Sequence, residues 1–237
     1  MPRRIAIIPA RGGSKRIPDK NIRDFCGRPM ISYALQAAME SGLFDIIHVS
    51  TDSENVAKTV NQLGFSIDFM RPSELADDHT PIMPVLKYIL ETYLARGIKF
   101  DEVTLIMACV PLLNAEDLIQ ASRLKDEDIH QRKVLGVAPY PVPIEWAFTR
   151  NVDGTMVPVE PGMFSVRSQD LEIKYFDAGM FCFFSAEQIL TSEDAGTDDG
   201  FIGYILPKYK AIDIDELDDW EFAEALYIGL NNMQRAE

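Results

Sequence analysis

The N-terminal stretch of the chain places the strongest constraint on its fold. Residues 5–8 form a short apolar run that is typical of a buried strand, and two glycines, Gly12 and Gly13, follow it in a loop. Glycines allow a sharp turn and bring backbone N–H groups close to a ligand. Arginine and lysine bind phosphate oxygens as a planar fork and as a mobile charge. The loop carries four such cations, Arg11, Lys15, Arg16 and Lys20.

The pattern is typical of polyphosphate binding, and the alternative is a solvated basic turn without chemistry. The 237-residue chain has 23 Lys and Arg against 37 Asp and Glu, a formal net charge of −14. A dense basic cluster is unexpected in so acidic a chain, so we favour phosphate binding. The acidity also argues against nucleic acid as a partner, because that needs a basic face.

The rest of the chain alternates apolar runs with helical patterns, which indicates a single α/β domain with a Rossmann-like, mainly parallel sheet and flanking helices. Prolines and an Asp153-Gly154 turn interrupt the pattern, so we expect a small inserted subdomain at about 140–175. Thr80 is the expected N-cap of the helix at 81–96. Strands are expected at 5–8, 44–50, 65–70, 103–108, 134–138, 178–184, 201–206 and 211–214, and helices at 29–40, 53–63, 81–96, 114–125 and 216–231.

Several other kinds of site find no support in the sequence. The three cysteines, Cys26, Cys109 and Cys182, are scattered and show no zinc or disulfide spacing. Neither G-x-x-x-x-G-K-[ST] nor G-x-G-x-x-G follows the first strand, which argues against a P-loop kinase and a dinucleotide-binding dehydrogenase. No apolar run approaches membrane-spanning length, so we expect a cytoplasmic protein that does not bind membranes.

Charged residues recur where the expected strands end. In an open α/β sheet, ligands bind at the carboxyl ends of the strands, so these residues should converge. Asp52 follows the second strand, and Arg71 with the group Asp77-Asp78-His79 follows the third. Asp213 and Asp215 lie at the last expected strand, and this convergence is stronger evidence for a site than any single cluster.

Asp213 and Asp215 flank Ile214, so on a strand their carboxylates share one face. Paired carboxylates suit Mg²⁺, which often shares its oxygen ligands with substrate phosphates. The alternative is an N-cap at Asp215 beside an exposed acid. The spacing alone does not choose between the two.

Residues 167–171 bring an arginine, an amide and an acid together, a set suited to a hydroxylated or carboxylated substrate or to an ordinary polar turn. The segments so far described resemble those of the acylneuraminate cytidylyltransferases, the CMP-sialic acid synthetases. The resemblance covers the opening loop at 8–21 and residues 50–52, 71–78, 167–171 and 213–215, in order along nearly the whole chain.

Within that family the chain is most similar to the pseudaminic acid branch. Sialic acid enzymes typically carry Gln-Pro-Thr-Ser-Pro-Leu-Arg after the fourth strand, whereas residues 107–113 here are Met-Ala-Cys-Val-Pro-Leu-Leu. Residues 177–179, Asp-Ala-Gly, are similar to the pseudaminate form, where sialic acid enzymes have an Asn-Gly pair. The alternatives are the same reaction on N-acetylneuraminic or legionaminic acid, and a non-catalytic nucleotide-binding regulator.

The resemblance implies a nucleotide-diphospho-sugar transferase type of fold and the reaction of CTP with a nonulosonic acid to give a CMP-sugar and pyrophosphate, with Mg²⁺. It implies catalytic roles for Arg11, Lys20 and Asp213, and a metal site at Asp213 and Asp215. It also implies that the inserted subdomain makes a homodimer. The residues implied for CTP are Ala10, Arg11, Gly12, Gly13, Lys15, Lys20, Asn21, Arg71 and Thr80, and those implied for the sugar are Arg167, Gln169 and Asp177.

Overall fold

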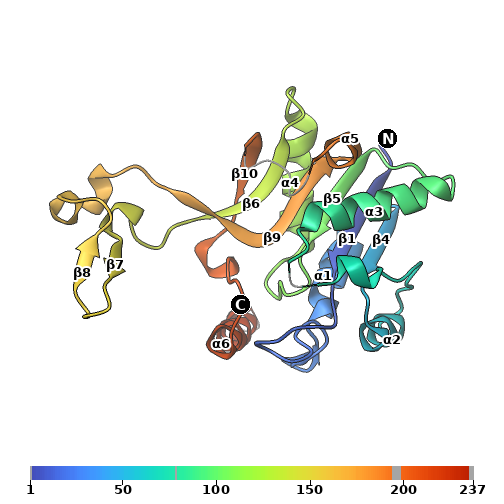
Figure 1. Cartoon of the computed structure of the whole chain (residues 1–237), viewed down its shortest axis with the longest axis horizontal. Helices are drawn as coiled ribbons and strands as arrows, with labels where there is room; N and C mark the ends of the chain where they lie inside the picture. Colours follow the sequence, from blue (N-terminus) through green and yellow to red (C-terminus); the bar gives the residue numbers. More distant parts are fainter. Residues whose placement is uncertain (1, 78, 194–198, 235–237) are drawn as a thin grey trace.

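The computed structural model describes residues 2–77, 79–193 and 199–234 and is built on a six-stranded sheet (Figure 1). The strand order is β10-β6-β9-β5-β1-β4. β1 pairs in parallel with β4 and β5, and β10 with β6, whereas β9 is antiparallel to β5 and β6. The expected mainly parallel α/β sheet is therefore confirmed. The strands are β1 (Arg4–Pro9), β4 (Ile46–Ser50), β5 (Glu102–Ile106), β6 (Lys133–Pro139), β9 (Tyr175–Ser185) and β10 (Phe201–Ile205).

Helices cover both faces of the sheet. The group α1, α2 and α4 packs on one face, and α3 with α5 packs on the other. No helix in the described part of the chain is both long and apolar enough to cross a membrane. The helices are α1 (Ile31–Ser41), α2 (Glu54–Gln62), α3 (Ile82–Ala95), α4 (Ala115–Glu127), α5 (Ala186–Leu190) and α6 (Leu217–Gln234).

Strand β1, which lies between β5 and the edge strand β4, contains the predicted apolar run, and residues 5–8 of it are wholly buried. Side chains alternate along a strand, so Ile5 and Ile7 pack toward α3 while Ala6 and Ile8 pack toward α1. All four are 0% exposed. Each buried isoleucine stabilises the fold by about 1.5–3 kcal/mol, so β1 holds the start of the basic loop firmly in place.

A third, smaller apolar cluster lies outside the two main layers. The short hairpin of β2 (Asp24–Phe25) and β3 (Arg28–Pro29), which the sequence did not predict, packs against α6. Its aromatic rings meet edge to face, as in Phe25 with Trp220 at 5.3 Å between centroids. We call this group the α6 cluster; its buried members are Ile17, Phe25, Met30, Tyr33, Ile214, Trp220 and Ala223.

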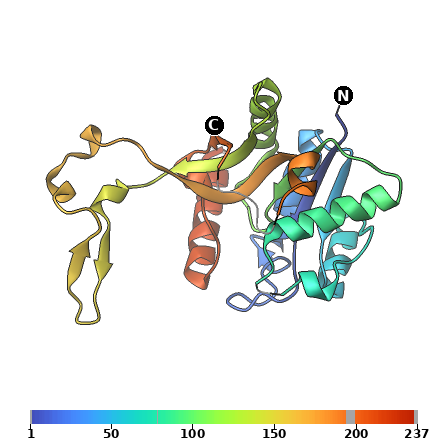
Figure 2. The same ribbon diagram turned by 45° about the horizontal axis from the view of Figure 1, so that its top comes forward.

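Residues 140–174 form an arm that projects from the sheet between β6 and β9 (Figures 1 and 2). It contains the antiparallel pair β7 (Phe148–Arg150) and β8 (Met156–Pro158) and three single turns of 3-10 helix, η2 (Ile144–Trp146), η3 (Met163–Ser165) and η4 (Ser168–Asp170). Large apolar side chains of the arm face solvent, among them Val152, Phe164 and Ile173. An apolar surface of this kind is typical of an interaction site.

Two expected strands are absent from the described structure. Residues 65–70 pair with no strand, although Phe65 and Ile67 pack on one core and Phe69 on the other. The alternation of apolar and polar residues in this segment therefore reflects the packing of its apolar side chains against two cores and not pairing of its backbone with another strand. Residues 211–214 also join no strand, yet Ile214 is still buried while Asp213 is exposed.

A buried histidine lies on the edge strand β4. His48 is 1% exposed, and its Nδ1 lies 3.0 Å from the hydroxyl of Tyr93, which donates to Asp68. Because that hydroxyl donates to Asp68, it accepts from Nδ1, which therefore carries a proton, while the buried Nε2 has no hydrogen-bond partner among the described residues. Burial lowers the pKa of His48 to about 4 despite the opposing charge of Asp68.

We expect stability to fall as the pH drops from about 6.5 to about 4. In this window the unfolded chain binds a proton at His48 and the folded chain does not, so protonation favours unfolding, by roughly 3 kcal/mol when complete. His48→Asn keeps an amide near Tyr93 without a titrating group. Urea unfolding across this pH range should therefore show a flatter acid limb in His48→Asn. The matched control is the exposed His130→Asn, which should behave as wild type; equal slopes in all three proteins would contradict the prediction.

Candidate active site

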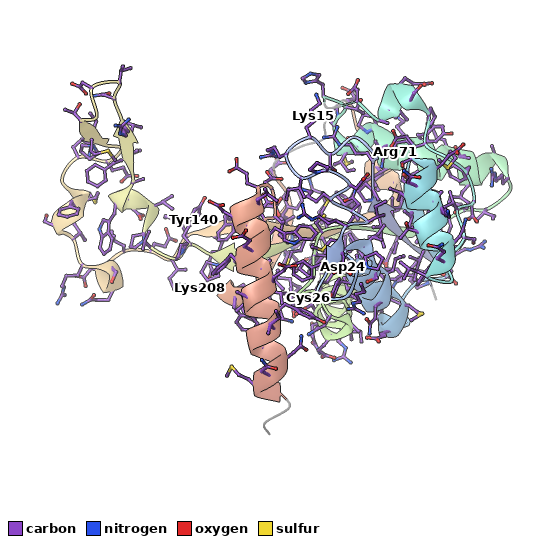
Figure 3. All side chains as sticks on the ribbon, turned by 90° about the horizontal axis from the view of Figure 1, so that it is seen from below. Lys15, Asp24, Cys26, Arg71, Tyr140 and Lys208 are labelled. Atoms are coloured by element: carbon purple, nitrogen blue, oxygen red, sulfur yellow. The ribbon has the colours of Figure 1, made fainter. Side chains whose placement is uncertain are left out.

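A cleft of about 370 Å³ opens at the carboxyl ends of β1 and β5. The basic loop after β1, the 71–80 loop, the segment after β5 and residues 213–215 all contribute to it. Figure 3 shows Lys15 and Arg71 on the same side of the α/β body, away from Tyr140 at the root of the arm. The predicted site residues that line the cleft are Arg11, Lys15, Lys20, Asn21, Arg71, Thr80, Asp213 and Asp215.

The first glycine of the basic loop sits where no side chain would fit. The N–H of Gly12 donates to Oδ1 of Asp52 at 3.0 Å, and a Cβ added at Gly12 would lie 2.7 Å from Cβ of Ser53. Gly12 therefore lets the loop approach the start of α2, and its N–H is already engaged. A Cβ at Gly13 would meet nothing within 4 Å. Ala10 is buried, and its N–H bonds the carbonyl of Ser50 at 2.9 Å.

Asn21 connects the basic loop to the segment after β5 through two side-chain hydrogen bonds. Its Nδ2 donates to the backbone oxygen of Arg11 at 2.9 Å, and its Oδ1 accepts from Sγ of Cys109 at 3.4 Å. Burial raises the pKa of the Cys109 thiol to about 12, although the charge of Lys20 opposes the shift. The thiol is thus neutral at physiological pH, which argues against a role as nucleophile.

The basic loop and the acidic residues meet across the cleft. Nζ of Lys20 donates to the backbone oxygen of Ile214 at 2.7 Å and lies 3.4 Å from Oδ1 of Asp215. A guanidinium nitrogen of Arg16 lies 2.8 Å from Oδ2 of the same carboxylate. The predicted convergence of loop cations and acids therefore occurs, although residues 213–215 are not in a strand.

The two carboxylates have different electrostatic surroundings. Asp213 is exposed to the cleft, but partial desolvation by the surrounding protein, followed by the negative charge of Asp215, raises its pKa. Burial also opposes ionisation of Asp215, but the hydrogen bond from Arg16 and the charge of Lys20 outweigh it and lower the pKa of Asp215. Of the two carboxylates, Asp213 is thus the one whose negative charge is less compensated by its neighbours. A bound cation would supply the missing positive charge.

This pair of acids fits Mg²⁺. Both side chains line the cleft on either side of the buried Ile214 and offer only oxygen ligands. Within the described residues no group of three or more histidine, cysteine, aspartate or glutamate side chains is placed to hold a metal. Mg²⁺ commonly uses only one or two carboxylates and takes its other ligands from phosphate and water.

Arg71 is held on the end of β4 and forms a wall of the cleft. Its Nε donates to Oγ of Ser50 at 2.9 Å, Nη2 to the Ser50 carbonyl at 2.7 Å, and its N–H to the carbonyl of Thr51 at 2.7 Å. Arg11 reaches toward the same loop, because its Nη1 donates to the Asp77 carbonyl at 3.2 Å. The 71–80 loop is therefore fixed to both β4 and the basic loop.

Thr80 has a different local role from the one expected. Its hydroxyl and its N–H both bond Oδ1 of Asp77, at 2.8 and 2.6 Å, and the N–H of His79 bonds the same atom at 2.8 Å. These bonds lower the pKa of Asp77, the largest effect being that of the Thr80 hydroxyl. The N-cap position of α3 is Pro81, so the prediction of Thr80 as N-cap was wrong. Thr80 still lines the cleft, and the neighbouring Asp78 lies outside the described residues.

The residues proposed for the sugar lie apart from the cleft. Arg167 and Gln169 are on the arm, in the segment of η4, and Arg167 pairs with Asp170 with Nε and Oδ2 2.8 Å apart. Asp177 is the third residue of β9, and its Oδ1 accepts the N–H of Gly179 at 2.8 Å. Gly179 lines the cleft, whereas the other three do not.

Two further residues belong to the site, although no ligand contact was predicted for either. Asp52, which the sequence placed after the second strand, lies two residues beyond the end of β4 and accepts the N–H of Gly12. Met107 lines the cleft after β5 with 39% of its side chain exposed. An exposed methionine adds a soft apolar surface to an otherwise charged site.

Comparison with known proteins gives three informative matches. A sequence profile described as cytidylyltransferase matches residues 5–135. The chain is 34% identical to a pseudaminic acid cytidylyltransferase of Campylobacter jejuni, over 94% of this chain and 95% of that one. It is 30% identical to a CMP-N,N'-diacetyllegionaminic acid synthase of Legionella pneumophila, over 94% and 95% of the two chains.

The fold is also shared with a solved structure. CMP:2-keto-3-deoxy-manno-octonic acid synthetase in complex with CTP superposes with a TM-score of 0.69 and 17% sequence identity, over 96% of this chain and 99% of that one. At this identity the likeness concerns the fold. It agrees with the expected nucleotide-diphospho-sugar transferase type of architecture.

The contact between Gly12 and Ser53 predicts the outcome of a double-mutant cycle. Gly12→Ala should weaken CTP binding about tenfold, because its Cβ would push the loop away from α2. Ser53→Gly removes the opposing Cβ at a cost of only a few tenths of a kcal/mol to the helix cap. Titration calorimetry with CTP should show that the double variant binds more tightly than Gly12→Ala. Additive losses would contradict the steric explanation.

Proposed function

Because this chain belongs to the cytidylyltransferase family, we propose that it transfers the cytidylyl group of CTP to pseudaminic acid and releases pyrophosphate. The observation that carries the reaction type is the meeting of the basic loop with Asp213 and Asp215 across one cleft. The full-length similarity to the Campylobacter enzyme supports pseudaminic acid as the sugar.

In this reaction the sugar's anomeric hydroxyl oxygen attacks the α-phosphorus of CTP. The new P–O bond forms as the bond from the α-phosphorus to the bridging oxygen breaks; that oxygen leaves with the pyrophosphate, and the hydroxyl proton passes to solvent water. Catalysis of this kind consists mainly of positioning and charge stabilisation. Arg11, Lys15 and Lys20 line the cleft and are proposed to hold the phosphates, while Arg71 and Thr80 face the nucleoside.

Asp213 and Asp215 are proposed to hold Mg²⁺, which when bound supplies positive charge to the phosphate oxygens. Asp213 offers the carboxylate whose negative charge is least compensated by its neighbours. Arg16 and Lys20 keep Asp215 ionised and tie it to the basic loop. The two carboxylates and the cations thus share one cleft.

Arg167 and Gln169 can serve the sugar only if the arm that presents them belongs to a second copy of the chain. Both lie on the arm, and neither lines the cleft of the same chain. Arg167 is 70% exposed, and the arm's exposed apolar side chains need a partner surface. We therefore propose a homodimer in which each arm completes the other copy's cleft.

The choice of sugar can be tested directly. Pyrophosphate release from CTP should be fastest with pseudaminic acid, slower with N,N'-diacetyllegionaminic acid and slowest with N-acetylneuraminic acid. The legionaminic acid synthase among the relatives makes that sugar the principal alternative. The ratio of kcat/KM values measures the discrimination. Faster turnover of N-acetylneuraminic acid would refute pseudaminic acid as the substrate, and tight CTP binding without any turnover would favour a regulator.

The proposed dimer predicts complementation between two inactive variants. Lys20→Ala removes a phosphate contact from the cleft, and Arg167→Ala removes a sugar contact from the arm. After unfolding and refolding together, the mixture should recover about a quarter of wild-type activity, because half of the dimers hold one intact site. The matched control pairs Arg167→Ala with Lys58→Ala, an exposed lysine on α2 that should leave activity unchanged on its own. A Lys20→Ala mixture no more active than its parents would exclude sites shared between subunits.

A further inference from the structure

The acid segment, residues 213–215, has no strand pairing to fix it, so other contacts must hold it in place. Ile214 is 1% exposed and inserts into the α6 cluster. From the first turn of α6, Oδ2 of Asp219 accepts the N–H of Asp215 at 3.0 Å and that of Glu216 at 2.8 Å. The position of the two carboxylates therefore follows the position of α6.

The basic loop is anchored in the same cluster. Ile17, also 1% exposed, is a member of it and lies three residues before Lys20. Lys20 in turn bonds the carbonyl of Ile214 at 2.7 Å. Ile17 and Ile214, which come from opposite ends of the chain, are thus buried in the same cluster. Ile17 anchors the loop that carries the cations, and Ile214 anchors the segment that carries the acids.

Trp220 is the largest side chain of the α6 cluster, and it connects α6 to the hairpin that follows the basic loop. It is 3% exposed and does not line the cleft. One contact is edge to face with Phe25 at 5.3 Å between centroids. Another is the guanidinium of Arg23, which lies 5.2 Å from the centroid of its ring. The indole thereby holds residues 23–25 against the helix that carries Asp219.

We propose that Trp220 is a positioning residue that sets the separation between the basic loop and the acid segment. It acts through Phe25 and Ile214 and touches no substrate. The inference deepens the proposed function, because it assumes that the two sides of the cleft hold one ligand together. Removing the indole should let the acid segment and the loop move independently while leaving the sheet intact.

Hydrogen exchange tests the coupling without any turnover. In Trp220→Ala, backbone amides of residues 15–22 and 213–216 should both exchange about tenfold faster, while β1 and β5 keep wild-type protection. Trp220→Phe retains an edge-to-face contact with Phe25 and should restore most of the protection. The matched control is Phe222→Ala, which removes a 61% exposed ring from the opposite face of α6 and should change neither segment. If Trp220→Ala does not fold, Trp220→Leu takes its place with the same expected direction.

The metal response separates positioning from general loss of structure. The affinity of the protein–CTP complex for Mn²⁺ can be measured by water-proton relaxation in the absence of sugar. It should fall about tenfold in Trp220→Ala, as it does when other residues that support metal ligands indirectly are replaced. In turnover assays kcat should fall and the half-saturating Mg²⁺ should rise, while KM for CTP changes less than threefold. Unchanged exchange and metal binding, or identical losses in Phe222→Ala, would overturn the inference. An inactive wild-type protein that still shows the coupled exchange would instead refute the proposed function alone.

Discussion

The hydrogen bond from Lys20 to the carbonyl of Ile214 joins two parts of the chain 194 residues apart, and the cleft depends on it. The order of the strands shows how far the chain must run from β10 to reach Lys20 in the loop after β1. β10 lies at one edge of the sheet and β1 four strand spacings away, about 19 Å in the plane of the sheet. Residues 206–215 must cross that distance along the carboxyl edge, which ten extended residues can do at about 3.3 Å each. A segment that crosses the strand ends cannot join their ladder, so the acids arrive on irregular backbone.

Positive charge is concentrated in the basic loop that the crossing segment reaches. The chain carries a formal net charge of −14, yet the loop after β1 gathers four cations. Two of them, Arg16 and Lys20, compensate Asp215 and lower its pKa, whereas burial raises that of Asp213. The cleft therefore combines cations suited to phosphate with one carboxylate that lacks a full counter-charge. An anionic ligand that arrives with a divalent cation satisfies both sides at once.

Much of this arrangement was predictable because it follows from local pattern and strand direction. The apolar run at 5–8 predicted β1, and the carboxyl ends of parallel strands predicted that Lys20 would meet the acids. The strand expected at 65–70 was wrong because alternate burial of Phe69 and its neighbours arises from packing against two cores. Trp220 gives no local signal, since its role comes from contacts that only the folded chain makes. Arg167 cannot be placed at a site from one chain, because its proposed partner surface lies on another.

The two sides of the cleft consequently differ in how firmly they are built. The 71–80 loop is tied to β4 through Arg71, and the neighbouring strand β1 has its residues 5–8 fully buried. The acid side rests on Ile214, on the cap at Asp219 and on the packing of Trp220. We therefore expect a substitution of Trp220 to change the spacing of cations and carboxylates while every residue that lines the cleft stays the same. The proposed role of Trp220 places control of the spacing across the cleft in a side chain that does not itself line it.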